Sequence, residues 1–168
     1  MSMMAIRAAT PRDREAIRLV EEHAFGQQAE AGLVDALVGE GDAVLELVAE
    51  EEGQVVGHIL FSRLHVQDGA RTFPAVALAP LAVEPSFHGT GIGGALVREA
   101  HVRLKAAGEK LSIVLGDPSY YGRFGYDHAR AAGFESEYQG EALQALAWGE
   151  APTHGRLVYA PAFSALAA

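Results

Sequence analysis

Residues Ser86–Ala100 read SFHGTGIGGALVREA, a stretch that places four glycines within six positions and then continues as an amphipathic helix. Gly89, Gly91, Gly93 and Gly94 would stand at the start of this helix. The first amides of a helix have no intrahelical acceptor and carry partial positive charge. Because glycine has no side chain, a ligand can approach these amides closely. The stretch therefore predicts an anion site, best suited to a phosphate or pyrophosphate.

Two kinds of nucleotide site are considered for this stretch. It lacks the Gly-Lys-Ser/Thr ending of a Walker-type loop. Gly89–Gly94 does match the dinucleotide pattern G-x-G-x-x-G, and Asp117 follows the next strand at about the place of a ribose-binding acid. However, residues 84–88 separate the preceding strand from the first glycine, and the strands before it are typical of an antiparallel meander. An NAD(P)-binding oxidoreductase is therefore the less favoured alternative.

The regions around the glycine stretch alternate between strand and helix patterns. We expect strands at Ala5–Ala9, Ala43–Glu50, Gln54–Val66, Thr72–Val83, Lys110–Leu115 and Arg156–Tyr159. We expect helices from about Thr10 to Phe25, at Ala29–Val38, Gly91–Ala107 and Glu141–Trp148, and a short helix or turn at Pro118–Gly125. Proline cannot donate to a strand ladder, so Pro80 predicts a bulge or an exposed edge. This order predicts an α/β or α+β layer with a single parallel crossover.

Composition limits the possible function classes. The chain has 168 residues, about half of them apolar, which suits one domain with a substantial core. It contains no cysteine, and its seven histidines show no metal-ligand spacing, so we expect no metal site. The net charge of −9 disfavours a nucleic-acid partner. No apolar run is long enough for a signal peptide or a membrane span, so we expect a cytoplasmic protein without a membrane partner.

Two motifs together resemble a known family. The segment LAPLAVEPSFHGTGIGGALV (78–97), then a strand, then SYYGRFGY (119–126), resembles the GCN5-related N-acetyltransferase (GNAT) family, in particular small bacterial acetyltransferases of unassigned substrate. The family's acyl-CoA motif, Arg/Gln-x-x-Gly-x-Gly/Ala, falls on His88–Gly93, with histidine at its first position. The resemblance runs from the first strand to about Phe134. It implies a mixed central sheet of six to seven strands, splayed between strands four and five and flanked by helices, in a single domain over residues 1–168.

The resemblance also implies the co-substrate and its binding residues. The co-substrate would be acetyl-CoA. Its pyrophosphate would be held by the glycine turn, comprising His88, Gly89, Thr90, Gly91, Ile92, Gly93 and Gly94. In the family the fourth strand is bulged and leaves main-chain groups free for the pantetheine arm. Here those groups would belong to Leu81, Ala82 and Val83.

A tyrosine carries the catalytic prediction. The family pattern aromatic-Tyr-x-x-x-Gly-aromatic falls on Tyr120–Tyr126 and points to Tyr121 as the general acid that protonates the departing thiolate. Phenol chemistry fits this role, because an unperturbed pKa of about 10 keeps the hydroxyl protonated near neutral pH. We expect Tyr120 and Tyr126 to pack in the core. The general base is left open, with Glu84 the first candidate and His58, His65 and Asp117 as alternatives.

The predicted activity is transfer of an acetyl group from acetyl-CoA to a primary amine of a small molecule, amino acid or peptide. A non-catalytic acyl-CoA-binding sensor is the alternative from another class. By resemblance, the acceptor pocket would form between Phe25–Gly32 and the C-terminal segment Trp148–Phe163. Phe25, Trp148, Tyr159 and Phe163 are its candidate lining residues. A homodimer is compatible with the resemblance, and the sequence does not identify the acceptor.

Overall fold

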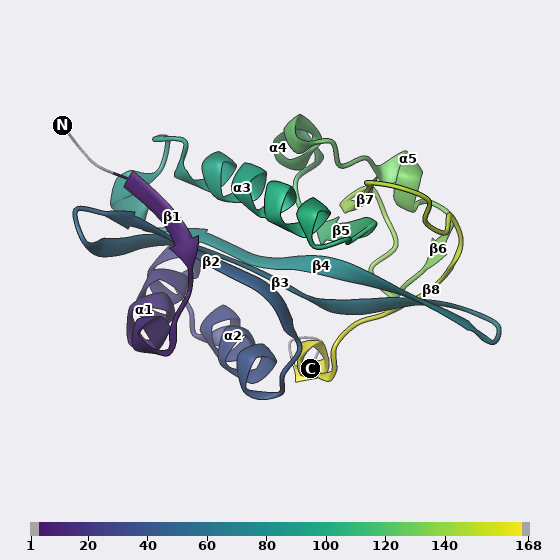
Figure 1. The fold of residues 1–168 in the computed structure, drawn as a ribbon, viewed down its shortest axis with the longest axis horizontal. Helices are drawn as coiled ribbons and strands as arrows, with labels where there is room; N and C mark the ends of the chain where they lie inside the picture. Colours follow the sequence, from purple (N-terminus) through teal and green to yellow (C-terminus); the bar gives the residue numbers. More distant parts are fainter. Residues whose placement is uncertain (1–3, 166–168) are drawn as a thin grey trace.

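The computed structural model describes residues 4–165, which form one mixed sheet with helices on both faces (Figure 1). The strands are β1 (Met4–Ala8), β2 (Ala43–Glu51), β3 (Gln54–Asp68), β4 (Arg71–Val83), β5 (Leu111–Leu115), β6 (Phe134–Glu135), β7 (Leu143–Ala147) and β8 (Gly155–Val158). The main order is β1-β2-β3-β4-β5-β7, and β8 pairs with both β3 and β6. The described residues thus form eight strands, where six to seven were expected.

Five α-helices flank the sheet: α1 (Arg14–Phe25), α2 (Ala29–Gly39), α3 (Ile92–Ala106), α4 (Pro118–Tyr121) and α5 (His128–Ala131). Helices α1 and α2 cover one face of the sheet, and α3 covers the other (Figure 1). The four-residue spacing predicted for α3 is confirmed, because Ile92, Leu96, Ala100 and Leu104 are all buried in one core cluster. Helix α3 lies close to the sheet at Gly57, where a Cβ atom would stand 3.0 Å from the side chains of Ile92 and Leu96.

Strand β4 has the bulge that Pro80 predicts. Ile59 of β3 pairs with Leu81, and Phe61 pairs with Leu78, so Leu60 alone lies opposite both Ala79 and Pro80. The extra residue on β4 bends the strand and interrupts its ladder. Beyond the bulge, β4 remains paired with β3 as far as Val83.

On its other edge, β4 separates from β5. The two strands are parallel and pair only at Val76–Ser112, Ala77–Ile113 and Leu78–Val114. Residues 81–83 therefore have a partner strand on one side only. This is the splayed pair of strands that the family resemblance implies, and it leaves main-chain groups of β4 facing a gap.

The helix expected over Glu141–Trp148 is wrong, because β7 occupies most of that segment. The sequence EALQALAW is rich in residues with high helix propensity, which explains the expectation. In the structure, Leu143–Ala147 pairs antiparallel with the whole of β5, from Leu111 to Leu115. Leu143 and Ala145 then enter a core cluster. Pairing with β5 and burial of alternate side chains outweigh the local propensity.

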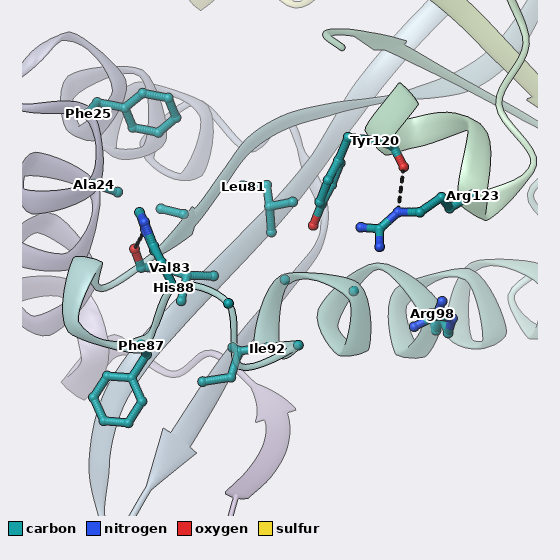
Figure 2. Close-up of a pocket in the computed structure, with 15 residues that line it drawn as sticks. Ala24, Phe25, Leu81, Val83, Phe87, His88, Ile92, Arg98, Tyr120 and Arg123 are labelled. Carbon is teal, nitrogen blue, oxygen red and sulfur yellow. Dashed lines mark hydrogen bonds between the residues drawn. The ribbon is translucent and has the colours of Figure 1, made fainter. Parts of the chain in front are cut away.

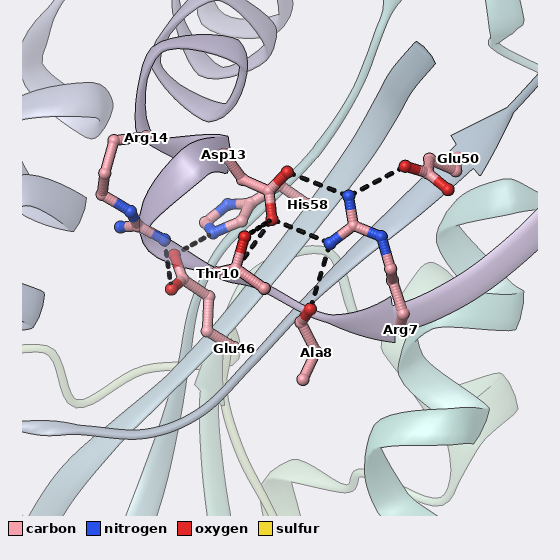
Figure 3. Close-up of polar contacts among 8 residues, drawn as sticks. All are labelled: Arg7, Ala8, Thr10, Asp13, Arg14, Glu46, Glu50 and His58. Atoms are coloured by element: carbon pink, nitrogen blue, oxygen red, sulfur yellow. Dashed lines mark hydrogen bonds and ion pairs between the residues drawn. The ribbon is translucent and has the colours of Figure 1, made fainter. Parts of the chain in front are cut away.

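A buried ionic cluster joins α1 to the sheet. His58 of β3 is fully buried; its Nδ1 lies 2.7 Å from Glu21 Oε2 and its Nε2 lies 2.7 Å from Glu46 Oε2. Glu46 also accepts a hydrogen bond from Arg14, as Figure 3 shows. Burial acts to lower the pKa of His58, but the hydrogen bonds to Glu21 and Glu46 outweigh it and raise this pKa. Burial raises the pKa of Glu21, and the bond to His58 offsets it only in part.

A second ionic group fixes the start of α1. Arg7 of β1 donates to both carboxylate oxygens of Asp13, at 2.8 and 2.9 Å, and to Glu50 at 2.8 Å (Figure 3). Asp13 also accepts hydrogen bonds from the main chain and side chain of Thr10. The hydrogen bond from Arg7 lowers the pKa of Asp13 well below its usual range. Thr10 and Asp13 thus form the capping arrangement that begins the helical segment.

Candidate active site

The glycine turn forms the N terminus of α3, as predicted. Gly91 is the N-cap with φ of +87°, and Gly89 has φ of +79°; both values lie in the left-handed region that favours glycine. The first main-chain bond of the helix runs from the Ala95 amide to the Gly91 carbonyl, at 3.0 Å. No side chain caps this end of the helix. The amides of Ile92, Gly93 and Gly94 therefore precede the first intrahelical bond and are available to a ligand.

A cavity of about 560 Å³ opens in front of these amides (Figure 2). Nine of the ten predicted co-substrate-binding residues line it, namely Leu81, Ala82, Val83, His88, Gly89, Gly91, Ile92, Gly93 and Gly94. The tenth, Thr90, does not line it, because its hydroxyl donates to the Phe87 carbonyl. No carboxylate lies among the described residues that line this first cavity, although the chain as a whole has a net charge of −9. The charge of the residues that line the first cavity therefore favours an anion.

Two of the four glycines also have a packing role that the sequence did not indicate. A Cβ atom on Gly93 would lie 2.6 Å from the hydroxyl oxygen of Tyr120. A Cβ atom on Gly94 would lie 3.1 Å from an Arg98 nitrogen and 3.5 Å from Phe124. The aromatic segment that contains α4 therefore packs directly on the first turn of α3. At Gly89 and Gly91, by contrast, an added Cβ atom would meet no atom within 4 Å. Glycine is favoured at these two positions by the positive φ of the backbone and not by close packing.

His88 contacts the end of β4 rather than the glycine turn. Its Nε2 lies 2.8 Å from the Val83 carbonyl oxygen, which fixes Nε2 as the protonated nitrogen (Figure 2). This bond holds the short turn between β4 and α3 in place. It also occupies one of the main-chain groups that the family resemblance assigns to the pantetheine arm, so the main-chain groups of Leu81 and the amide of Val83 are the better candidates.

Three residues that line the first cavity were not predicted there from the sequence. Tyr120, expected in the core, lines the cavity with its hydroxyl directed toward α3 (Figure 2). Arg123 stacks on the Tyr120 ring with its guanidinium carbon 4.7 Å from the ring centroid. Arg98 lies 5.0 Å from the Phe124 centroid. Arg98 follows Gly94 by one helical turn, and this spacing is the signal that could have placed it beside the anion site.

A second cavity of about 460 Å³ lies on the other side of the splayed strands. Phe25 and Leu81 line both cavities, so the two meet at the gap between β4 and β5. Tyr159 and Phe163 line the second cavity, as predicted for the acceptor pocket. Trp148 does not line the second cavity, because it packs beside His101 against the core under α3.

Tyr121 lines the second cavity near the end of β5. Its ring packs on Gly116, where a Cβ atom would lie 2.5 Å from Tyr121 Cε2, and it contacts Tyr120 edge to face at 4.9 Å. Burial raises the pKa of Tyr121 to about 12. A phenol in this environment stays protonated across the neutral range and can donate a proton. Tyr126 is buried in the core, as expected, and its hydroxyl bonds Ser112 and His101.

The structure does not bring the base candidates to either cavity. Glu84 lines neither one; its carboxylate contacts His23 Nδ1 at 2.7 and 3.0 Å. His58 is enclosed in the ionic cluster under α1, and His65 lies on β3 where β8 pairs with it. Asp117 caps α4 by accepting bonds from the main chain and side chain of Ser119. The role of Glu84 as base therefore stays a prediction.

The dinucleotide alternative is not supported by this architecture. Asp117 is engaged at α4, and β2, β3 and β4 pair antiparallel, so the glycine motif does not follow the first strand of a doubly wound sheet. Among residues 4–165 no group of three or more potential ligand side chains is placed to hold a metal ion. Within the same range no helix has the length and apolar character needed to cross a membrane.

Comparison with known sequences gives matches over most of the chain. A family model described as an acetyltransferase (GNAT) domain matches residues 5–129. The uncharacterized N-acetyltransferase YjhQ of Escherichia coli is 42% identical over 118 residues, which cover 68% of this chain and 65% of that protein. The uncharacterized N-acetyltransferase YhbS of the same species is 38% identical over 144 residues, covering 81% of this chain and 85% of that protein.

Solved structures agree with these matches. A GNAT family acetyltransferase from Brucella melitensis, in complex with acetyl-CoA, superimposes with a TM-score of 0.82 at 38% identity, over 96% of this chain and 98% of that one. YhbS from Escherichia coli, in complex with CoA, gives a TM-score of 0.90 at 30% identity, over 98% and 93% of the two chains. The overall arrangement of strands and helices described above is thus shared with both.

Proposed function

The chain belongs to the GNAT acetyltransferase family, and from that premise we propose that it transfers the acetyl group of acetyl-CoA to a primary amine of a small molecule, amino acid or peptide. It is an acyltransferase, and acetyl-CoA is its co-substrate. Residues 1–168 would form a single catalytic domain, because the described part of the chain shares one sheet. A homodimer stays a prediction.

One observation carries the proposal: unbonded amides at the start of α3 open into a cavity that contains arginines and no carboxylate among its described lining residues. This environment suits the pyrophosphate of the co-substrate. The amides of Ile92, Gly93 and Gly94 would donate to it, with Arg98 and Arg123 adding positive charge. Arginine binds phosphate oxygens well because its donors are arranged in a planar fork.

The pantetheine arm would then lie along the gap between β4 and β5. Alternate residues of β4 face β3; because the Glu84 amide bonds the Val56 carbonyl of β3, the main-chain groups of Ala82 also face β3, whereas those of Leu81 and the Val83 amide face the gap and can bond the amides of the arm. Leu81 lines both cavities, and the gap therefore leads from the anion site to Tyr121. This path would carry the thioester into the second cavity, where the acceptor amine enters.

In the chemical step, the lone pair of the neutral amine attacks the thioester carbonyl carbon. The new carbon–nitrogen bond forms, the carbon–sulfur bond breaks, and the sulfur takes the proton of the Tyr121 hydroxyl. The products are an N-acetylated amine and CoA thiol. The amine's own proton passes to water or to a base, and solvent reprotonates Tyr121. A phenol pKa of about 12 means that Tyr121 is protonated at the start of each cycle.

Calorimetry with acetyl-CoA and with NADH, followed by detection of free CoA thiol over a panel of primary amines, tests the proposal. We expect acetyl-CoA to bind, NADH not to bind, and at least one amine to release thiol. Absence of acetyl-CoA binding would contradict the proposal outright. Binding without thiol release from any amine would indicate the acyl-CoA sensor instead.

Two tyrosine variants test the general acid. Tyr121→Phe should lower kcat by about 10²- to 10⁴-fold, the usual effect of losing a general acid, with the acetyl-CoA Kd nearly unchanged. Tyr120→Phe is the matched contrast, because its ring is edge to face with Tyr121 but its hydroxyl points toward α3. It should affect the acetyl-CoA Kd more than kcat. Equal kcat values for Tyr121→Phe and the wild type would remove the assignment.

A further inference from the structure

The second cavity is lined mainly by aliphatic and aromatic side chains. Its aromatic residues are Phe25 of α1, Tyr121 of α4, Tyr138 of the connection between β6 and β7, and Tyr159 and Phe163 of the C-terminal segment. Tyr159 contacts Tyr138 at 5.4 Å and Phe163 at 5.3 Å between ring centroids. Its volume of about 460 Å³ lies within the usual range for small-molecule pockets, roughly 300–1,000 Å³. The walls therefore suit an apolar or aromatic body.

Glu30 is the one charged side chain among the described residues that line this cavity. It lies in the first turn of α2, directly after the connection that also brings Phe25 to the cavity. Both carboxylate oxygens accept from the Gln27 side-chain amide, at 3.0 and 3.1 Å. None of the ion pairs within residues 4–165 involves Glu30, and the hydrogen-bond partner of its partly exposed carboxylate is the neutral Gln27 amide.

A carboxylate without a cation in an apolar pocket attracts a positively charged ligand and repels a negatively charged one. Aromatic faces add to this preference, because their quadrupoles also attract ammonium groups. The Gln27 amide orients both oxygens of Glu30 while leaving lone pairs of each oxygen free for another donor. These features together define a site for an ammonium group attached to an apolar body.

We propose that Glu30 selects the acceptor: it binds the ammonium group of an arylalkyl or similarly apolar primary amine and rejects amines that carry a neighbouring carboxylate. This inference rests on the proposed acetyltransferase function and narrows it, because it removes free amino acids from the acceptor classes. Glu30 binds the amine in its protonated form, before the amine loses a proton and attacks the thioester. The acid role of Tyr121 is separate.

Three probes that share the phenylethylamine skeleton separate the charge effect from the shape effect, since two of them differ only in the charge of the added group. 2-Phenylethylamine carries the amine alone, phenylalanine adds a carboxylate beside it, and phenylalaninamide replaces that carboxylate with a neutral group. We expect thiol release with 2-phenylethylamine and phenylalaninamide, and a kcat/KM at least about tenfold lower with phenylalanine. A hydrogen bond to a charged group typically changes affinity by this factor or more.

Glu30→Gln keeps the shape of the side chain and removes its charge. It should raise the KM for 2-phenylethylamine by about tenfold or more, leave kcat within about threefold, and abolish the discrimination against phenylalanine. Glu30→Lys should reverse the preference toward phenylalanine. Glu40→Gln is the matched control, because Glu40 is exposed at the other end of α2 and lines neither cavity. A purely structural role for Glu30 would change thermal stability but not the ratio between the probes.

Direct binding keeps this inference distinct from the proposed function. Calorimetry of the three probes into the protein saturated with CoA measures recognition without turnover. Tighter binding of 2-phenylethylamine than of phenylalanine, lost in Glu30→Gln, supports the inference even if no thiol is released, in which case only the acetyltransferase proposal fails. Equal use or binding of the two probes by the wild type, or an unchanged ratio in Glu30→Gln, would overturn the inference.

Discussion

Replacing His58 by leucine would test the ionic cluster under α1 most sharply. His58 is fully buried and hydrogen-bonded to two carboxylates at 2.7 Å each. In His58→Leu, Glu46 keeps its bond to Arg14, but Glu21, which is 0% exposed, has no remaining hydrogen-bond partner among the described residues. Removing one partner of a buried ion pair costs roughly 3–5 kcal/mol, because the other charge stays buried.

The expected loss is large enough to measure by thermal unfolding. For a domain of this size, each kcal/mol lowers Tm by about 2–4 °C, so His58→Leu should unfold roughly 6–20 °C below the wild type at pH 7. His154→Gln is the matched control, since His154 pairs with Asp68 at the surface and is 70% exposed. Exposed pairs of this kind contribute little, so its Tm should stay close to that of the wild type.

The effect of pH on His58→Leu gives an independent check. Burial raises the pKa of Glu21, so the folded variant binds more protons at this site than the unfolded chain does. Its stability therefore rises as the pH falls from 7 toward the unfolded pKa of about 4.3. The wild type gains less over this interval, because its His58 partly offsets the raised pKa of Glu21. The raised pKa of His58 itself adds stability only as the pH falls to the unfolded histidine value of about 6.5. The difference in free energy of unfolding between the two proteins should therefore shrink between pH 7 and pH 5.

A double variant shows whether the buried charge is the cause. Glu21→Leu/His58→Leu removes the unpaired carboxylate together with the histidine, and apolar replacements of buried ion pairs are often tolerated. It should therefore be more stable than His58→Leu alone at pH 7. A free energy of unfolding of His58→Leu within about 1 kcal/mol of the wild-type value would refute this explanation. So would a double variant that is less stable than His58→Leu by an amount that does not depend on pH.

Three further predictions concern the site and its support. Gly91→Ala places an alanine at φ of +87°, which costs about 1–2 kcal/mol of strain. It should raise the acetyl-CoA Kd measured by calorimetry. Gly32→Ala, where the added Cβ atom has open space within α2, should leave this Kd unchanged. Leu96→Ala empties a fully buried position between α3 and Gly57 and should lower the free energy of unfolding by about 2–5 kcal/mol in urea, while exposed Val102→Ala should have little effect. Because burial raises the pKa of Tyr121 to about 12, kcat should show no alkaline decline due to this residue below about pH 10; a decline near pH 8 that vanishes in Tyr121→Phe would contradict the assignment.

The sequence predicted the features that follow from local rules. Glycines at the start of an amphipathic helix predicted the first turn of α3, because positive φ and close approach have few other solutions. Pro80 predicted the bulge in β4 because proline cannot complete a ladder. These rules act over a few residues, so the sequence contains all the information they need.

What the sequence did not predict depends on contacts between distant segments. Residues Leu143–Ala147 favour a helix by propensity, but pairing with the free edge of β5 stabilises them as strand β7. Tyr120 lines the first cavity and Trp148 does not line the second, because the packing of α4 and of the core under α3 decides both. Glu30 enters the second cavity only once α2 is placed against the C-terminal segment. No short-range pattern specifies these neighbours.

The narrow join between β4 and β5 has a consequence for the order of events in catalysis. These strands share three residue pairs, whereas β3 and β4 share eleven, so the main-chain pairing between β4 and β5 is short and ends at Leu78 and Val114. A pantetheine arm in the gap beyond this pair would bond the main-chain groups of β4 that have no partner in β5. The second cavity takes lining residues from both sides of this gap, Leu81 on β4 and Leu115 on β5, both beyond the last pair. Bound acetyl-CoA would therefore form part of the border of this cavity, and we expect the amine to bind second, after the co-substrate.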